Sequence, residues 1–294
     1  MNDKIVRAVT DTGAVRAFAA ATTGLVNEAH RMHHTWPIAS AALGRTLTAA
    51  AMMGWMLKSD KESVTLQLTG DGPMGRVIAV ADNRARVKGY VGDPLVDLPN
   101  NDLGKLNVGG AVGKNGYLTV IRDLGMKEPY IGRVPLVSGE IGDDLTSYFA
   151  VSEQTPSSVG LGVLVDTDLT IKAAGGFLVQ VMPEATEEDI CQLERNIGAI
   201  QSVTAMMEQG MCPEDMMGRL LEGFPYSITD EIEPAYDCDC TRQRVERALI
   251  SLGESELTKL IEEDGKAELT CHFCDKVYAF DKAELEGLLK SAKR

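Results

Sequence analysis

The sequence lacks any long uninterrupted apolar run. Its most apolar helical stretch, Trp36 to Leu57, is interrupted by Arg45 and is rich in alanine and glycine. This pattern predicts a buried helix and not a membrane span. The opening residues, MNDKIVRAVT, carry charge early and have no apolar centre of the kind found in export signals. We therefore expect a cytoplasmic protein with no membrane partner.

Basic residues are also in short supply. The chain has 29 Lys and Arg against 43 Asp and Glu, a net charge of −14, which disfavours nucleic acid as a partner. The imbalance is concentrated between Glu184 and Asp237, where 13 acidic and 2 basic residues give a balance of −11. The other 240 residues have 30 acidic and 27 basic side chains, a balance of only −3. One acidic segment thus joins two differently built parts of the chain.

No catalytic constellation can be assigned, and we expect a protein that is not an enzyme. The glycines of GDGPMG (70–75) have the spacing of a dinucleotide-binding loop, but the residues that follow, RVIAVAD, form a strand pattern and not a helix. A hairpin turn is predicted there instead. His30, His33 and His34 are attributed to a polar helix face near its end, and not to a metal site.

The order of the predicted elements indicates an α+β fold, with a mostly antiparallel N-terminal sheet domain and grouped helices. An opening hairpin is followed by a helical stretch over 23–58, interrupted at Pro37, and by a helix over 139–153. The strand predictions are 64–69, 75–81, 87–91, 117–123, 159–165 and 169–181. Together these elements predict one domain over residues 1–182.

Residues 183–234 are predicted to form an acidic, helical linker. Thr186 and Asp189 have capping spacing at the start of a helix, and Pro213 opens a shorter one. Five of the 13 methionines lie here: Met206, Met207, Met211, Met216 and Met217. Unbranched methionine suits a surface that repacks against varied partners, but it serves equally as filler in an ordinary helix core. Both interpretations stay open at this point.

A small module is predicted over residues 235–294, with three helices, two short strands and a C-H-F-C turn. It contains four of the six cysteines, Cys238, Cys240, Cys271 and Cys274, as a C-x-C and a C-x-x-C pair. In a reducing compartment this quartet indicates one zinc ion held by four thiolates, in preference to free thiols or permanent disulfides. A module of this size has only marginal stability without a metal ion or another cross-link. Cys191 and Cys212 are expected to be small buried side chains.

Oxidation of the four thiolates would favour disulfides between near neighbours. Closing a loop across 30 residues costs more chain entropy than joining cysteines one or two residues apart. We therefore expect the pairs Cys238–Cys240 and Cys271–Cys274. Bridges across such small rings are strained and easily reduced, which suits a reversible switch.

The cysteine pattern and the sequences around it resemble the redox-regulated heat-shock protein 33 chaperone family. The similarity also covers LTGDGPMGRVIAVAD, GGFLVQVMPEA and CHFCDKVYAF, and extends over essentially the whole chain. The resemblance implies that residues 1–182 are a chaperone core, and that the protein is inactive when reduced and zinc-bound. Oxidation would release zinc, form the two disulfides and unfold the zinc module and the linker. The oxidised form, a homodimer, would bind unfolding proteins without ATP.

Two other classes remain as alternatives. A zinc-ribbon adaptor for nucleic acid or protein is disfavoured because residues 231–294 contain 15 acidic and 10 basic side chains. A thiol–disulfide oxidoreductase would place its C-x-x-C motif at a helix N-terminus, whereas Cys274 leads into a predicted strand.

Overall fold

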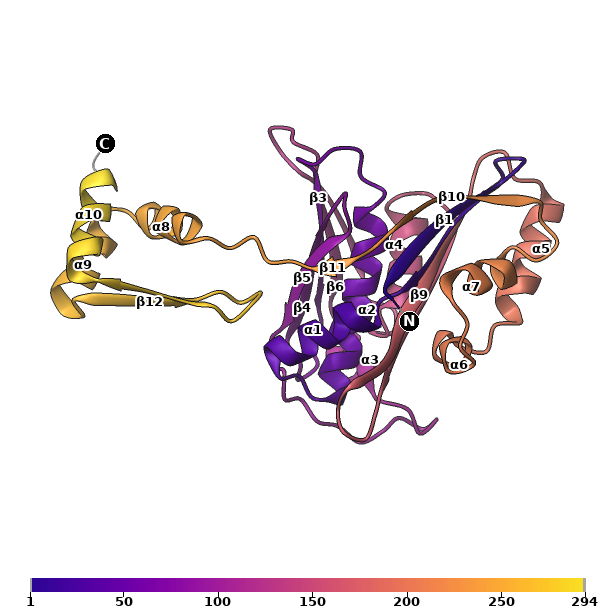
Figure 1. The fold of residues 1–294 in the computed structure, drawn as a ribbon, viewed down its shortest axis with the longest axis horizontal. Helices are drawn as coiled ribbons and strands as arrows, with labels where there is room; N and C mark the ends of the chain where they lie inside the picture. Colours follow the sequence, from indigo (N-terminus) through magenta and orange to yellow (C-terminus); the bar gives the residue numbers. More distant parts are fainter. Residues whose placement is uncertain (1, 293–294) are drawn as a thin grey trace. The chain divides into compact units, whose positions relative to one another are not determined.

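The computed structural model describes residues 2–292 and divides the chain into two compact units at one point. Unit 1 ends at Asp237, and unit 2 begins at Cys238. Among the described residues no helix is both long enough and apolar enough to cross a bilayer. Unit 1 includes the acidic segment 183–234 together with everything before it, while all four clustered cysteines belong to unit 2. The predicted α+β class is confirmed (Figure 1).

The first sheet of unit 1 has five strands in the order β10-β1-β2-β9-β8, and every pair is antiparallel. The strands are β1 (Lys4–Thr10), β2 (Val15–Ala21), β8 (Ser157–Val165), β9 (Ile171–Val181) and β10 (Tyr226–Ile232). The β1–β2 hairpin matches the predicted opening hairpin. β10 comes from the segment predicted as a helical linker, and it forms the edge of this sheet beside β1.

The second sheet has six strands in the order β11-β5-β4-β3-β6-β7. The strands are β3 (Ser63–Thr69), β4 (Arg76–Asp82), β5 (Arg86–Val91), β6 (Tyr117–Asp123), β7 (Tyr130–Pro135) and β11 (Ala235–Tyr236). Its pairs are antiparallel except for β11, which lies parallel to β5. The GDGPMG segment is the β3–β4 turn, as predicted. A Cβ at Gly72 would lie 2.2 Å from the Ala111 carbonyl, so this turn needs glycine to approach its neighbour.

One buried helix connects the two sheets. The helices of this part are α1 (Thr23–His33), α2 (Pro37–Gly54), α3 (Val108–Val112) and α4 (Gly142–Val151). α2 packs on β4 and β5 of one sheet and on β8 and β9 of the other (Figure 1). All residues of α2 except Pro37 and Arg45 are buried, because the small side chains of the helix let both sheets approach it closely. Arg45, which interrupts the apolar run, forms an ion pair with Glu140 at 2.5 Å.

Three short helices cover the opposite face of the first sheet. They are α5 (Glu187–Gly198), α6 (Val203–Glu208) and α7 (Pro213–Leu220). Because side chains alternate along a strand, Ile5 points to the α2 side, whereas Val6 and Ala8 point to these helices. Met216 and Met217 are fully buried in this second core. In this state the methionines act as core residues of a docked segment.

Unit 2 has its own small core. Its elements are α8 (Arg242–Ser251), α9 (Glu254–Glu263), β12 (Lys266–Thr270), β13 (Val277–Asp281) and α10 (Lys282–Ala292). Six buried side chains form the core described here: Leu249, Leu257, Ile261, Tyr278, Phe280 and Leu285. The predicted start of the last helix is confirmed, because Asp281 and Glu284 each accept a hydrogen bond from the other's backbone N–H. This core is too small to provide much stability alone.

Candidate metal centre

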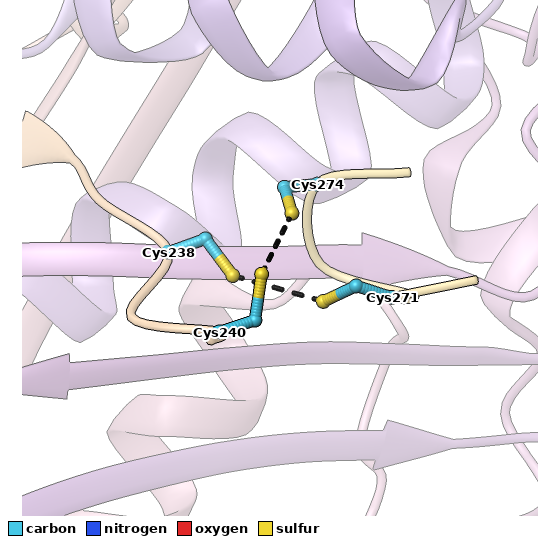
Figure 2. A group of neighbouring side chains, drawn as sticks. All are labelled: Cys238, Cys240, Cys271 and Cys274. Atoms are coloured by element: carbon cyan, nitrogen blue, oxygen red, sulfur yellow. Dashed lines mark hydrogen bonds between the residues drawn. The ribbon is translucent and has the colours of Figure 1, made fainter. Parts of the chain in front are cut away.

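Four cysteine sulfurs meet in unit 2, although they come from two places in the sequence. Cys238 and Cys240 lie in the segment between β11 and α8, and Cys271 and Cys274 lie in the turn between β12 and β13. Figure 2 shows the four side chains pointing toward one another. All four Sγ atoms lie within 4.8 Å of one another. Among the described residues this is the one such group of potential metal ligands.

The distances between sulfurs fit a tetrahedral site. The Sγ atoms of Cys238 and Cys271 are 3.7 Å apart, and those of Cys240 and Cys274 are 3.3 Å apart. Four sulfurs at the usual zinc–sulfur bond length of about 2.3 Å lie about 3.8 Å from one another. The donor set and its spacing therefore fit one zinc ion.

Backbone hydrogen bonds shape the turn that contains Cys271 and Cys274. The N–H groups of Cys274 and Asp275 donate to the Cys271 carbonyl at 3.2 and 2.8 Å, and Cys271 N–H donates to the Lys276 carbonyl at 3.0 Å. Asp275 adopts a left-handed conformation with a φ of 53°. Both sulfurs are thus fixed between two strands, and neither lies at a helix N-terminus, where an oxidoreductase C-x-x-C would lie.

A tyrosine next to the cluster was not predicted as part of the site. The Tyr278 hydroxyl, on β13, lies 3.2 Å from the Cys240 sulfur and 3.0 Å from the Cys240 carbonyl oxygen, and it donates toward them. Tyr278 is also one of the buried core side chains of unit 2. The sequence feature that points to this contact is the hydroxyl group, because a buried tyrosine usually needs a hydrogen-bond partner.

Three of the thiols, those of Cys238, Cys240 and Cys274, differ in how readily they ionise. Burial opposes ionisation of Cys240, but hydrogen bonds from Tyr278 and from the neighbouring thiols outweigh it and lower the pKa of Cys240 to about 7. Burial raises the pKa of Cys274 to about 11, and it also raises the pKa of Cys238 well above its usual value. Since thiolates bind metals and react with oxidants, the Cys240 sulfur is more ready for either reaction than the sulfurs of Cys238 and Cys274.

The other two cysteines correct one prediction. Cys191 is exposed and Cys212 is partly exposed, whereas both were expected to be buried. On α5 the buried positions are Leu193 and Asn196, and the helical period places Cys191 on the other face. Cys212 is the N-cap of α7, where its thiol donates to Asp215 at 3.0 Å.

The histidines of α1 are not gathered into a metal site. His30 Nδ1 lies 3.0 Å from the Thr35 carbonyl oxygen. The prediction that His33 lies on a polar helix face is wrong, because the side chain is buried. Its Nε2 atom lies 3.0 Å from the Tyr236 hydroxyl, which gives the buried ring a polar partner. This contact joins residues 203 positions apart, which no local pattern could predict.

Comparison with known proteins gives a consistent result across the whole chain. A family model described as Hsp33 protein matches residues 3–281. A "33 kDa chaperonin" of Alkaliphilus metalliredigens is 52% identical over 98% of this chain and 99% of its own length. The protein of the same name from Clostridioides difficile is 49% identical over 99% of each chain.

A solved structure agrees with these matches. The crystal structure of the 33 kDa chaperonin of Thermotoga maritima, titled a heat shock protein 33 homolog, aligns with a TM-score of 0.90. It is 39% identical and covers 99% of both chains. The family model, the sequence relatives and the solved structure agree with one another, and the chain belongs to the Hsp33 family of chaperones.

Proposed function

We propose that this chain is a redox-switched, ATP-independent holdase. When reduced, it is inactive and holds one zinc ion; when oxidised, it releases zinc, loses the fold of unit 2 and frees the acidic linker to bind unfolding proteins. The observation that carries this proposal is the meeting of four thiols in a unit whose described residues include only six buried core side chains. Membership of the chaperone family supports the choice of client proteins as partners.

Cys238, Cys240, Cys271 and Cys274 would hold the zinc ion. The ion would act as a structural staple, since four thiolates leave no open position for a substrate or water. Structural zinc contributes roughly 10–16 kcal/mol of apparent binding free energy, compared with about 5–15 kcal/mol for the whole stability of a typical domain. Loss of the thiolates would therefore remove most of the free energy that stabilises the fold of unit 2.

Oxidation would act on the sulfurs themselves. Each disulfide forms when a pair of thiolates gives up two electrons, and hydrogen peroxide takes these electrons together with two protons from the solvent and is reduced to water. We propose Cys238–Cys240 and Cys271–Cys274 as the pairs. A sulfur bound in a disulfide is no longer a thiolate ligand, so zinc leaves.

The linker, residues 183–234, would supply the binding surface. Its helices now pack apolar side chains on the first sheet, with Met216, Met217 and Leu220 buried. Basic side chains of β1 form ion pairs with acidic residues of the linker. Lys4 pairs with Glu214 at 2.9 Å and with Glu231 at 3.1 Å, and Arg7 pairs with Asp230. Released, the segment would present apolar groups beside carboxylates that keep it solvated. We further propose that it works in the cytoplasm and that the oxidised form is a homodimer.

A single experiment tests the switch. Reduced and peroxide-treated protein are mixed with a thermally unfolding client, light scattering is followed, and released zinc is measured in parallel. We expect only the oxidised, zinc-free form to suppress aggregation. Suppression by the reduced, zinc-bound form to the same extent would overturn the proposal.

Two variants sharpen the comparison. Cys271→Ser removes one zinc ligand and one disulfide partner, so zinc affinity should fall and the response to peroxide should be lost. Cys191→Ser is the matched control, because this cysteine is exposed on α5 and outside the cluster. Proteolysis should cut residues 184–237 far faster in the oxidised wild-type protein than in the reduced protein.

A further inference from the structure

The chain that leaves the first sheet is fastened to the second sheet just before unit 2 begins. In β11, Ala235 N–H donates to the Ala85 carbonyl at 3.2 Å, and Asp237 N–H donates to the Val87 carbonyl at 2.8 Å. This ladder is only two residues long. Two such bonds at a sheet edge form a weak attachment unless side chains add to it.

The Tyr236 side chain adds further hydrogen bonds to this attachment. Its hydroxyl donates to the Gly89 carbonyl at 2.8 Å and accepts from the Gly89 N–H at 3.2 Å. The phenol therefore takes the place of a further strand residue beside β5, and it satisfies both backbone groups of Gly89. Its ring packs against the main core of unit 1.

His33 completes the attachment from the end of α1. Its Nε2 atom lies 3.0 Å from the Tyr236 hydroxyl, and the two rings meet edge to face with centroids 6.3 Å apart. The single hydroxyl proton is directed to Gly89, so the hydrogen bond from His33 requires a proton on Nε2. One tyrosine thus ties together β11, β5 and α1.

We propose that Tyr236 is a latch that keeps the linker docked, separately from the zinc site. This inference rests on the proposed holdase function and names a control point within it. The linker is anchored at one end by β9 and at the other by Tyr236. While both ends are held, an undocked linker is a closed loop with restricted conformations; release of Tyr236 frees one end, and the gain in chain entropy favours undocking.

The latch and the cysteine cluster belong to different units. Unfolding of unit 2 removes the fold that begins at Cys238, but every contact of the latch described above lies within unit 1. Loss of zinc therefore does not itself break the contacts that hold Tyr236. The linker is released fully only when the Tyr236 hydroxyl leaves Gly89 and His33.

Hydrogen exchange in the reduced, full-length protein tests the latch directly. Tyr236→Phe keeps the ring and removes the hydroxyl, so we expect exchange in residues 187–237 to become about 10-fold faster. His33→Gln retains an N–H donor and should keep most of the protection. Tyr130→Phe is the matched control, because it removes a hydroxyl that bonds to Ser152 at 3.2 Å, outside the latch.

The outcomes separate the latch from general loosening. Peptides from β3 and β6 should exchange at the wild-type rate in Tyr236→Phe. Wild-type exchange throughout residues 187–237 in Tyr236→Phe would overturn the latch, as would an equal acceleration in Tyr130→Phe. Because no oxidant is used, this result is independent of the proposed switch; a failure of the switch would show instead as retained zinc or an inactive oxidised wild type.

Discussion

At the scale of single residues, one hydroxyl distinguishes Cys240 from its neighbours. Tyr278 donates to the Cys240 sulfur at 3.2 Å, and this bond favours the thiolate over the thiol. The pKa of Cys240 falls to about 7, while that of Cys274 rises to about 11. A hydrogen-bonding residue beside a metal ligand tunes both metal affinity and reactivity.

Tyr278→Phe should therefore weaken zinc binding near neutral pH. Without the donor, the pKa of Cys240 rises from about 7 toward its ordinary value, and protons compete better with zinc for the sulfur. We expect zinc affinity about 10-fold lower near neutral pH and a smaller loss in alkaline solution, where the thiol ionises anyway. Competition with a coloured chelator across pH measures this. Tyr226→Phe, in unit 1, is the control; an equal loss at all pH values would contradict the explanation.

The cluster itself could be predicted from spacing, but its surroundings could not. A C-x-C and a C-x-x-C pair have few purposes in a reduced protein, so the spacing of Cys238, Cys240, Cys271 and Cys274 is enough to indicate a metal site. Tyr278 reaches Cys240 across 38 residues, and Tyr236 reaches His33 across 203. Such contacts depend on how the elements pack, which sequence periodicity does not encode.

At the scale of elements, the linker helices are held by burial on one side and solvated on the other. Met216 is fully buried between α7 and the first sheet, whereas the acidic side chains of these helices are mostly exposed. Docking therefore depends on a limited apolar contact. A small loss of packing should shift the balance toward release.

Met216→Ala should activate the protein without oxidant. The truncation removes buried contacts and leaves a cavity, at a cost of about 2–5 kcal/mol. We expect faster hydrogen exchange in residues 187–232 and partial suppression of client aggregation by the reduced, zinc-bound protein. Met126→Ala, at a side chain that is 63% exposed, should change neither measurement. Unaltered exchange in the Met216 variant would show that docking does not depend on this contact.

Acid should also undock the linker. Asp189 accepts from Thr186, and Asp215 accepts from Cys212, and these bonds lower the pKa of both carboxyl groups. Groups with a depressed folded pKa stabilise the folded form above their unfolded pKa of about 4, and that stabilisation is lost as pH falls through the folded value. Exchange in residues 184–220 should therefore accelerate below about pH 4 relative to α2.

A double variant isolates this effect from acid unfolding in general. Asp189→Asn with Asp215→Asn lacks both ionisable caps, so its linker should be less protected than the wild type at neutral pH. Its protection should then change less on acidification. An unchanged acid response in the double variant would assign the effect to other carboxyl groups.

Most elements of the fold followed from local pattern, and the exceptions share a cause. The β1–β2 hairpin, α2 and the capped start of α5 were predictable because alternation, helical spacing and capping residues are local signals. β10 was not, since YSITDEI is mostly exposed and polar and pairs with β1 more than 200 residues earlier in the chain. β11 has two residues, and β7 is an edge strand containing Gly132 and Pro135.

At the scale of the whole molecule, the two units have separate cores. The buried side chains of unit 2 form a cluster that does not include those of unit 1. Each unit therefore has its own stability. The proposed zinc site lies within the smaller unit, where a bound metal would make the larger difference to stability.

Chelation of zinc should accordingly unfold one unit and spare the other. After zinc removal under reducing conditions, amides of residues 238–290 should exchange at nearly unprotected rates, while those in β3, β4 and β6 keep their protection. Hydrogen exchange with mass spectrometry measures both regions in one sample. Restored protection on adding zinc is the control, and simultaneous unfolding of both sheets would contradict independent cores.

The position of β10 at the edge of the first sheet has a consequence for assembly. In the docked state β10 pairs with β1 from Ile5 to Thr10, so the backbone of β1 is hydrogen-bonded on both sides. Whenever β10 departs, a row of N–H and C=O groups on β1 loses its partners and becomes an open edge. Undocking therefore creates a main-chain template as well as an apolar surface, and an open edge accepts extended polypeptide by backbone pairing, whatever its side chains.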